Sequence, residues 1–170
     1  MADVVNLKAG QRAQRKTLIT VAEWGDGDSQ NREILGARTE DSSIEFNPDV
    51  STSTDILGIT YSDVNKTEPQ QTFDPFFLLG GSKLGAYLAE AALANDIDAY
   101  NGVFNIYIIT AFIGTEGAYK CIKHSGCTIL PTSIGGDSYV SMPIEVHYSN
   151  NIEKGTVDAL TDAFEFTKTV

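Results

Sequence analysis

The sequence predicts a mainly β protein, a β-sandwich or barrel flanked by one α-helix. Several short runs rich in β-branched and aromatic residues are separated by turns that contain glycine, proline or asparagine. One segment, residues 82–95, instead carries apolar residues at helical spacing. With 170 residues the chain is long enough to bury a core, and we expect a single domain over residues 1–170.

Residues 1–15 are expected to form a flexible N-terminal arm. They contain few large apolar side chains, so little offsets the entropy that ordering would cost. The first 16 residues hold one acid, Asp3, and four basic residues: Lys8, Arg12, Arg15 and Lys16. A free basic tail and an arm that orders against an acidic neighbour both fit this pattern. In the second case Lys8 and Arg12 are the candidate contacts.

Two strands are predicted next, over residues 15–23 and 33–40, on either side of a turn at residues 25–29. The turn alternates glycine with acidic residues, which resembles a calcium loop. It lacks the ligand spacing and the final glutamate of an EF-hand, so we expect no metal site there.

Residues 41–80 are expected to form a hairpin followed by an arm. The predicted strands are 43–47 and 52–62, joined by a turn at Asn47-Pro48-Asp49, because proline fixes φ and removes a donor. Residues 63–72 are polar and show no apolar period, and the dense apolar run 73–79 follows. We expect the stretch from Asn65 to Leu79 to contact a neighbouring subunit or ring rather than its own core. The candidate contact residues are Lys66, Phe73, Phe76 and Phe77.

A flanking helix is predicted over residues 82–95. Ser82 suits an N-cap, and Asn95-Asp96 suits a stop. The apolar stripe has helical spacing and consists of Leu84, Tyr87, Leu88, Ala91 and Ala92.

Four further strands are predicted after the helix. The run 103–113 is apolar on both faces, which is typical of a strand buried on both sides, or on one side with a subunit interface on the other. A strand over 118–130 follows, with a possible break at Ser125-Gly126. Residues 138–148 alternate, with Met142, Ile144 and Val146 on the apolar face. The last predicted strand covers 156–167.

No catalytic, cofactor or metal site is predicted. Cys121, His124 and Cys127 invite a zinc interpretation, but a fourth ligand is missing. On an unbroken strand the two cysteines would share a face and the histidine would point away, which favours structural cysteines and a surface histidine. The Gly80-Gly81-Ser82-Lys83 run has the wrong order for a phosphate loop. The sequence therefore gives no sign of an enzyme.

The chain is strongly acidic, with a net charge of −11 and a pI near 4.4. Tight nucleic-acid binding is disfavoured, because proteins that bind phosphate backbones carry basic patches. No apolar run approaches the length of about 20 residues that a bilayer span needs, so no membrane association is expected. Two cysteines without a disulfide framework fit a reducing cytoplasm.

The run DSSIEFNPDVSTSTDILGITYSDVNKTEP, at 41–69, and the run FDPFFLLGGSKLGAYL, at 73–88, carry a family resemblance. They resemble the major tail tube protein of long-tailed bacteriophages, in the version from phages of Gram-positive hosts. The resemblance is strongest over residues 41–96 and weaker over 102–170. It implies six copies in a ring, rings stacked into a tube with one continuous inner β-barrel, and a conduit for DNA without specific binding.

The resemblance also implies partners and a location. These are other copies of the chain, a tape measure protein inside the tube, and tail tip and terminator proteins. The location is the virion tail, assembled in the host cytoplasm. A tube that passes DNA should repel it, and the candidate lumen residues are Glu145, Asp158 and Asp162. Glu145 lies opposite the apolar face of its predicted strand, while the two aspartates share a face of the last predicted strand.

Two other classes of protein remain open from the residues alone. One is an acidic β-sandwich binding module that recognises a carbohydrate or a protein. The other is a small hydrolase with an unrecognised site, for which no residue can be nominated.

Overall fold

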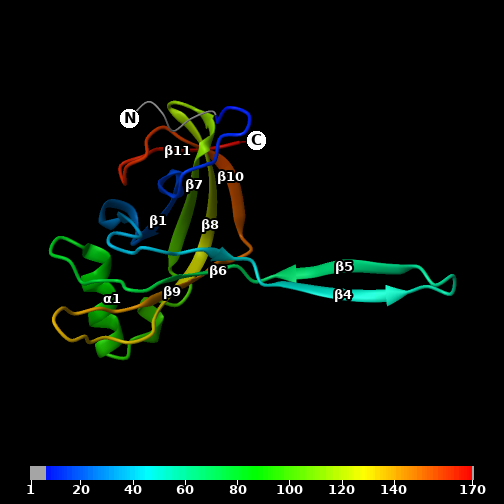
Figure 1. Ribbon diagram of the computed structural model, residues 1–170. Helices are drawn as coiled ribbons and strands as arrows, with labels where there is room; N and C mark the ends of the chain where they lie inside the picture. Colours follow the sequence, from blue (N-terminus) through cyan, green and yellow to red (C-terminus); the bar gives the residue numbers. More distant parts are fainter. Residues whose placement is uncertain (1–6, 170) are drawn as a thin grey trace.

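The computed structural model describes residues 7–169 and shows a mainly β protein with one α-helix, in agreement with the predicted fold class (Figure 1). Short 3₁₀ turns η1, η2 and η3 cover Arg15–Thr17, Gly27–Ser29 and Ile97–Ala99, and the helix α1 covers Lys83–Leu93. The strands are β1 (Leu18–Trp24), β2 (Asn31–Ile34), β3 (Ile44–Glu45), β4 (Pro48–Thr54), β5 (Thr60–Thr67), β6 (Gln70–Phe73), β7 (Phe104–Thr115), β8 (Ala118–Pro131), β9 (Ile144–His147), β10 (Ile152–Val157) and β11 (Phe166–Lys168).

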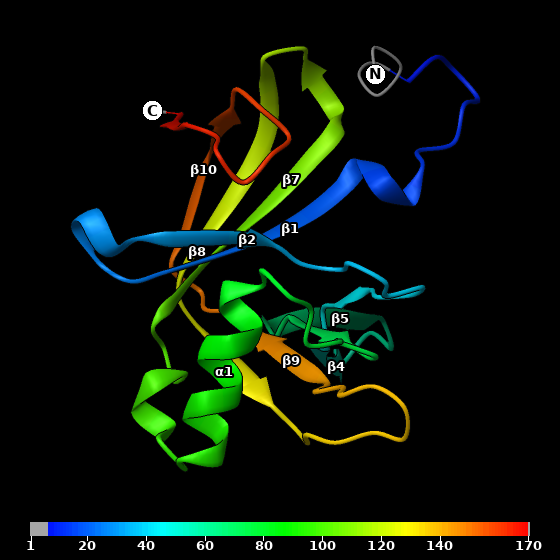
Figure 2. The ribbon, with the colours of Figure 1, turned by 90° about the vertical axis from the view of Figure 1, so that its left-hand side faces the viewer.

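Nine strands form one antiparallel sheet in the order β2-β1-β7-β8-β9-β6-β3, with β10 and β11 joined to it through β8. The long strand β8 pairs with β7 along one side. On its other side it pairs first with β10 and then with β9, so the sheet divides there into two wings (Figure 2). The other two strands, β4 and β5, pair only with each other.

Two apolar clusters lie on opposite faces of this sheet. On one face, Ile106 of β7 packs in a cluster that α1 covers with Leu84 and Leu88. On the other face, Tyr107 and Ile109 pack in a cluster that the C-terminal segment closes. Strand β7 is therefore buried on both sides, which is the first of the two alternatives that its apolar sequence left open.

Helix α1 begins where the sequence predicts. The Ser82 hydroxyl accepts a hydrogen bond from the Gly85 backbone N–H at 3.0 Å. The Glu33 carboxylate of β2 accepts from the Ser82 hydroxyl at 2.6 Å and from the Leu84 N–H at 3.0 Å. These bonds satisfy N–H groups that a helix start leaves unpaired, and they fix α1 to the edge of the sheet.

The predicted break in β8 is a bulge. Gly126, at φ 77°, has no partner between the pairs Asn105–Ser125 and Phe104–Cys127. The extra residue reverses the alternation, so Cys121 packs in one apolar cluster and Cys127 in the other. The expectation that the two cysteines share a face is wrong for this reason.

Three expected strands have other bounds in the structure. The second strand lies earlier, at Asn31–Ile34, and the expected strand 138–148 is regular only over Ile144–His147. The expected last strand, 156–167, is instead the end of β10, a loop and β11. Met142, Ile144 and Val146 are fully buried, as their alternation predicts. Among the described residues, no helix is both long and apolar enough to cross a membrane.

Candidate self-assembly surface

The β4–β5 hairpin projects from the body of the protein into solvent (Figure 1). Every residue of both strands is exposed, so neither face of the hairpin packs on the body. A two-stranded ribbon without a covered face is marginally stable in water. The hairpin therefore has the form of an element that another surface completes.

The hairpin turns at residues 55–59, not at the predicted Asn47-Pro48-Asp49. Pro48 is the first residue of β4, a position at which strands tolerate proline. Residues 63–72, which were expected to form a polar arm, are divided between the end of strand β5 and most of strand β6. Exposure of both faces explains the missing apolar period in the sequence.

Asp55 organises the turn of the hairpin. Its Oδ1 accepts from the backbone N–H of Leu57 at 2.8 Å and of Ile59 at 3.0 Å. Its Oδ2 accepts from the Tyr61 hydroxyl at 3.2 Å. The bond from the Ile59 N–H, with further help from Leu57 and Tyr61, holds the pKa of Asp55 below its ordinary value.

Large apolar side chains lie on the hairpin without cover. At the tip, Ile56 is fully exposed and Leu57 is 79% exposed, with Ile59 beside them half exposed. Val50 and Val64 form a cross-strand pair nearer the base. Apolar side chains grouped on a projecting element mark a binding surface more often than a free one.

The apolar run 73–79 after the hairpin contains both core residues and partly exposed residues. Phe73 is 1% exposed and Phe76 is 6% exposed, and both belong to the cluster beneath α1. The expectation that they contact a neighbour rather than their own core is wrong, because β6 is an internal strand between β9 and β3 and carries Phe73 inward. Phe77 is half-buried and pairs with Ser141 in an isolated bridge. Lys66 is exposed at the hairpin base, where its Nζ lies 2.7 Å from the Glu68 carboxylate.

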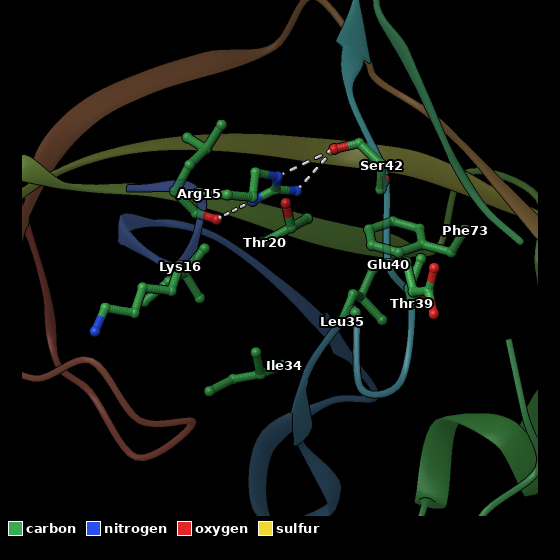
Figure 3. A pocket seen from close by; sticks show the side chains of 12 residues that line it. Arg15, Lys16, Thr20, Ile34, Leu35, Thr39, Glu40, Ser42 and Phe73 are labelled. Carbon is green, nitrogen blue, oxygen red and sulfur yellow. Dashed lines mark hydrogen bonds between the residues drawn. The ribbon is translucent and has the colours of Figure 1, made fainter. Parts of the chain in front are cut away.

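The N-terminal segment is anchored from Arg15 onward. Figure 3 shows the Arg15 guanidinium reaching the carbonyl of Ser42, and the two bonds measure 2.8 and 3.2 Å. The same guanidinium donates to the carbonyl of Leu18 at 2.6 Å. It fills part of a cavity of about 330 Å³ beside β1 and β2. Lys8 and Arg12 are exposed. The expectation for residues 1–15 falls partly outside the described residues, and the role of both side chains stays a prediction.

The three candidate lumen residues lie on two different elements of the fold. Glu145 is on β9, opposite the buried Ile144 and Val146, and its carboxylate lies 3.3 Å from Nε2 of His147. Asp158 and Asp162 are exposed in the loop between β10 and β11. The expectation that these two share a strand face is wrong, because the chain leaves the sheet after Val157.

His124 is buried, contrary to the expected surface histidine. The Gly126 bulge places it on the same face as Cys127. Its Nδ1 lies 2.8 Å from the carbonyl oxygen of Ser149, and its ring packs against Tyr148 at 5.0 Å between centroids.

Burial raises the pKa of the Cys121 thiol to about 12, so that side chain is a thiol at neutral pH. Across residues 7–169, no three His, Cys, Asp or Glu side chains are placed to hold a metal ion.

Glu23 is a buried charge that the sequence analysis missed. It is 1% exposed, and its carboxylate accepts from the Arg32 guanidinium, the Asn105 amide at 2.9 Å and the Tyr107 hydroxyl at 3.2 Å. Arg32 also lies over the Phe164 ring and donates to the Phe164 carbonyl at 2.6 Å. All of these partners are internal, so the group holds the C-terminal loop on the sheet rather than facing a ligand.

A second cavity, of about 450 Å³, opens between the loops at 77–79 and 139–140. It is lined by Arg38, Phe77, Leu78, Leu79, Tyr139 and Val140. Its walls come from three distant segments, so no local sequence pattern indicates it.

Comparisons with known proteins give structural similarities only. No family model and no curated protein matches the chain. The chain is similar to a protein in the cryo-EM structure of an extracellular contractile injection system, the PVC sheath–tube complex in its extended state. The identity is 17%, the TM-score is 0.47, and the match covers 88% of this chain and 95% of that one. It is also similar to a protein in the 6-fold symmetrised cryo-EM structure of the anti-feeding prophage baseplate, at 12% identity and a TM-score of 0.45, over 79% of this chain and 91% of that one. Because both TM-scores are below 0.5, we assign no function from either similarity.

Proposed function

We propose that this chain is a structural tube subunit of a phage-like tail, whose copies close into rings that stack around a hollow lumen. The observation that carries the proposal is the β4–β5 hairpin, a fully exposed ribbon with an aliphatic tip on an otherwise well-packed domain. No residue of this ribbon belongs to either core cluster of its own subunit. It suits a subunit that obtains much of its stability from its neighbours.

The sequence resemblance gives the finer terms of the proposal. Residues 41–96 resemble the tail tube protein from phages of Gram-positive hosts. This stretch includes the whole β4–β5 hairpin and helix α1. We therefore propose sixfold rings, a continuous inner barrel, passage of DNA without specific binding, and assembly with tape measure, tip and terminator proteins. Lys8, Arg12, Lys66 and Phe77 are proposed subunit contacts, and Glu145, Asp158 and Asp162 are proposed lumen residues.

The proposal is tested by shortening the hairpin. Thr52 and Ser62 pair across β4 and β5, so residues 53–61 can be replaced by Asn-Gly as a two-residue turn. The parent protein should form rings or tubes in negative-stain electron microscopy, while the shortened variant stays monomeric. Because the removed residues touch no core cluster, circular dichroism and the thermal midpoint should remain those of the parent monomer.

Two results would contradict the proposal. A shortened variant that forms tubes as the parent does would show that the hairpin is not an assembly element. A parent protein that stays monomeric at every concentration and binds glycans or a protein ligand would favour the binding module instead.

A further inference from the structure

We propose that the tip of the β4–β5 hairpin of one copy inserts into the cavity between residues 77–79 and 139–140 of the next copy. This inference rests on the proposed self-assembly and names the surface that receives the hairpin. The occupant is therefore a second copy of the same chain.

Geometry on the molecule favours contact between copies. The hairpin leaves the body on one side, and the 75–82 and 132–142 loops lie on the other side (Figure 1). In the second view these loops and α1 face the viewer while the hairpin lies behind them (Figure 2). A tip and a receptor at opposite ends of one molecule give a head-to-tail contact, which repeats from copy to copy and closes into a ring or continues as a filament.

The receptor is ordered before any tip arrives. The Leu78 N–H donates to the Val140 carbonyl at 3.2 Å, which joins the two loops. Gly135 and Ser141 exchange backbone hydrogen bonds at 3.0 and 2.7 Å, and Phe77 bridges to Ser141. Leu78 packs on the core cluster beneath α1, so the floor of the cavity is anchored in the body.

The cavity and the tip have matching chemistry. Tyr139 is 79% exposed and Val140 about half exposed at the rim, so the receptor also presents uncovered apolar surface. Its volume of about 450 Å³ falls in the range of sites that enclose compact ligands. Ile56 and Leu57 are the most exposed large apolar side chains of the hairpin.

The charges of the two surfaces are complementary. Arg38 is the charged residue among those that line the cavity. The hairpin carries three aspartates, Asp49, Asp55 and Asp63, against one lysine, Lys66. Within the described residues, Oδ2 of Asp55 accepts one hydrogen bond, so it retains capacity to accept from a guanidinium. In a chain with net charge −11, such a local attraction distinguishes this contact from other approaches.

Two other cavities fit the tip less well. The cavity beside β1 and β2 already holds the Arg15 guanidinium (Figure 3). The cavity at the hairpin base is lined mostly by polar residues, among them Glu68, His124 and His147.

Cross-linking between copies tests the contact directly. Both native cysteines are buried, so an Ile56→Cys, Tyr139→Cys double variant offers two new accessible thiols. Under assembly conditions a short bis-maleimide should link it into a ladder of dimers, trimers and longer chains. Each single variant lacks one half of the contact and should give no ladder. The matched control, Ile56→Cys with Ile97→Cys, places the second thiol on exposed η3 and should not give a ladder either.

A second measurement distinguishes loss of assembly from loss of folding. Ile56→Asp should raise the protein concentration needed for assembly by about tenfold or more while the monomer keeps its thermal midpoint. Ile97→Asp is the control and should change neither quantity. Tubes that form without a cross-linked ladder, or that ignore Ile56→Asp, would overturn this contact and leave the proposed function standing. A protein that never assembles would overturn both.

Discussion

At the scale of single residues, Phe73 decides whether the apolar run 73–79 belongs to the subunit or to an interface. Its side chain is buried beneath α1 with Leu84 and Leu88. Phe73→Ala should destabilise the isolated monomer by about 3–5 kcal/mol, the cost of emptying a large core site. Urea unfolding at low protein concentration measures this loss.

Phe46 provides the matched control for Phe73. It is 64% exposed beside the hairpin base, and Phe46→Ala should leave the monomer's free energy of unfolding nearly unchanged. If both variants unfolded at the parent's urea concentration, the core position of Phe73 would be wrong.

Asp55 makes the order of the hairpin tip dependent on pH. Hydrogen bonds from Ile59, Leu57 and Tyr61 favour the carboxylate, so its pKa in the folded turn lies below that of the unfolded chain. A depressed pKa means that the stabilisation is fully present above the unfolded pKa. It is lost as the pH falls through the folded value. The tip should therefore be ordered at neutral pH and loosen in acid.

Amide hydrogen exchange at Leu57 and Ile59 measures this dependence. Protection should decrease in acid after correction for the intrinsic exchange rate, and Asp55→Ala should show low protection already at neutral pH. Asp55→Asn keeps an acceptor oxygen and should lie between the two. Equal protection in Asp55→Ala and the parent at neutral pH would contradict this role for the carboxylate.

At the scale of elements, the sequence predicts best where burial leaves a periodic pattern. Helix α1 follows from the Ser82 cap and the spacing of Leu84 and Leu88. Strand β7 follows from apolar residues on both faces, and the structure covers both faces. Each of these elements is specified by side chains that contact the core of the same chain.

The sequence predicts the bounds of the β4–β5 hairpin less well, for the opposite reason. Both of its faces meet solvent in the monomer, so no apolar alternation shows where its strands end, and the predicted strand 52–62 runs through the turn. Pro48 looked like a break, although the first position of a strand tolerates proline. The better signal was Asp55 followed by Gly58, at φ 78°, which suits a turn that places glycine in the left-handed region. The exposed residues Ile56 and Leu57 then lie at its tip.

The cavity that we propose as the receptor could not be predicted in the same way. Arg38, Leu78 and Tyr139 come from three segments that are far apart in the sequence. Their proximity depends on the β6–β9 pairing and on the bridge between Phe77 and Ser141. Neither of these contacts leaves a local pattern in the sequence, so the cavity can be recognised only in the folded structure.

At the scale of the whole molecule, the acidic charge must be reconciled with self-assembly. A net charge of −11 on each copy opposes close approach of the copies at low ionic strength. The Debye length is about 8 Å at physiological ionic strength, so charges separated by more than this distance interact weakly. Short-range apolar contacts at the hairpin can then determine assembly, while acidic groups on the wall of a lumen still act on DNA that comes close to them.

Glu145 is the proposed lumen residue that the sheet positions most firmly. On β9 it pairs with Leu130 of β8 and Thr72 of β6, and it points away from the core that Ile144 and Val146 enter. If this face lines the tube, Glu145→Lys repeats a new positive charge around every ring. Lysines near DNA release condensed counterions, which strengthens binding in a salt-dependent way.

We therefore expect Glu145→Lys tubes to retain duplex DNA at low salt and to release it as salt rises, measured by co-sedimentation of assembled tubes. Particles built with this subunit should eject their genome more slowly. Glu90→Lys makes the same charge change on an exposed position of α1, outside the sheet, and should leave DNA affinity at the parent level. Because a lumen multiplies the charge only after rings close, unassembled Glu145→Lys protein should also bind weakly. Well-formed Glu145→Lys tubes that bind no more DNA than Glu90→Lys tubes would place Glu145 away from the DNA path.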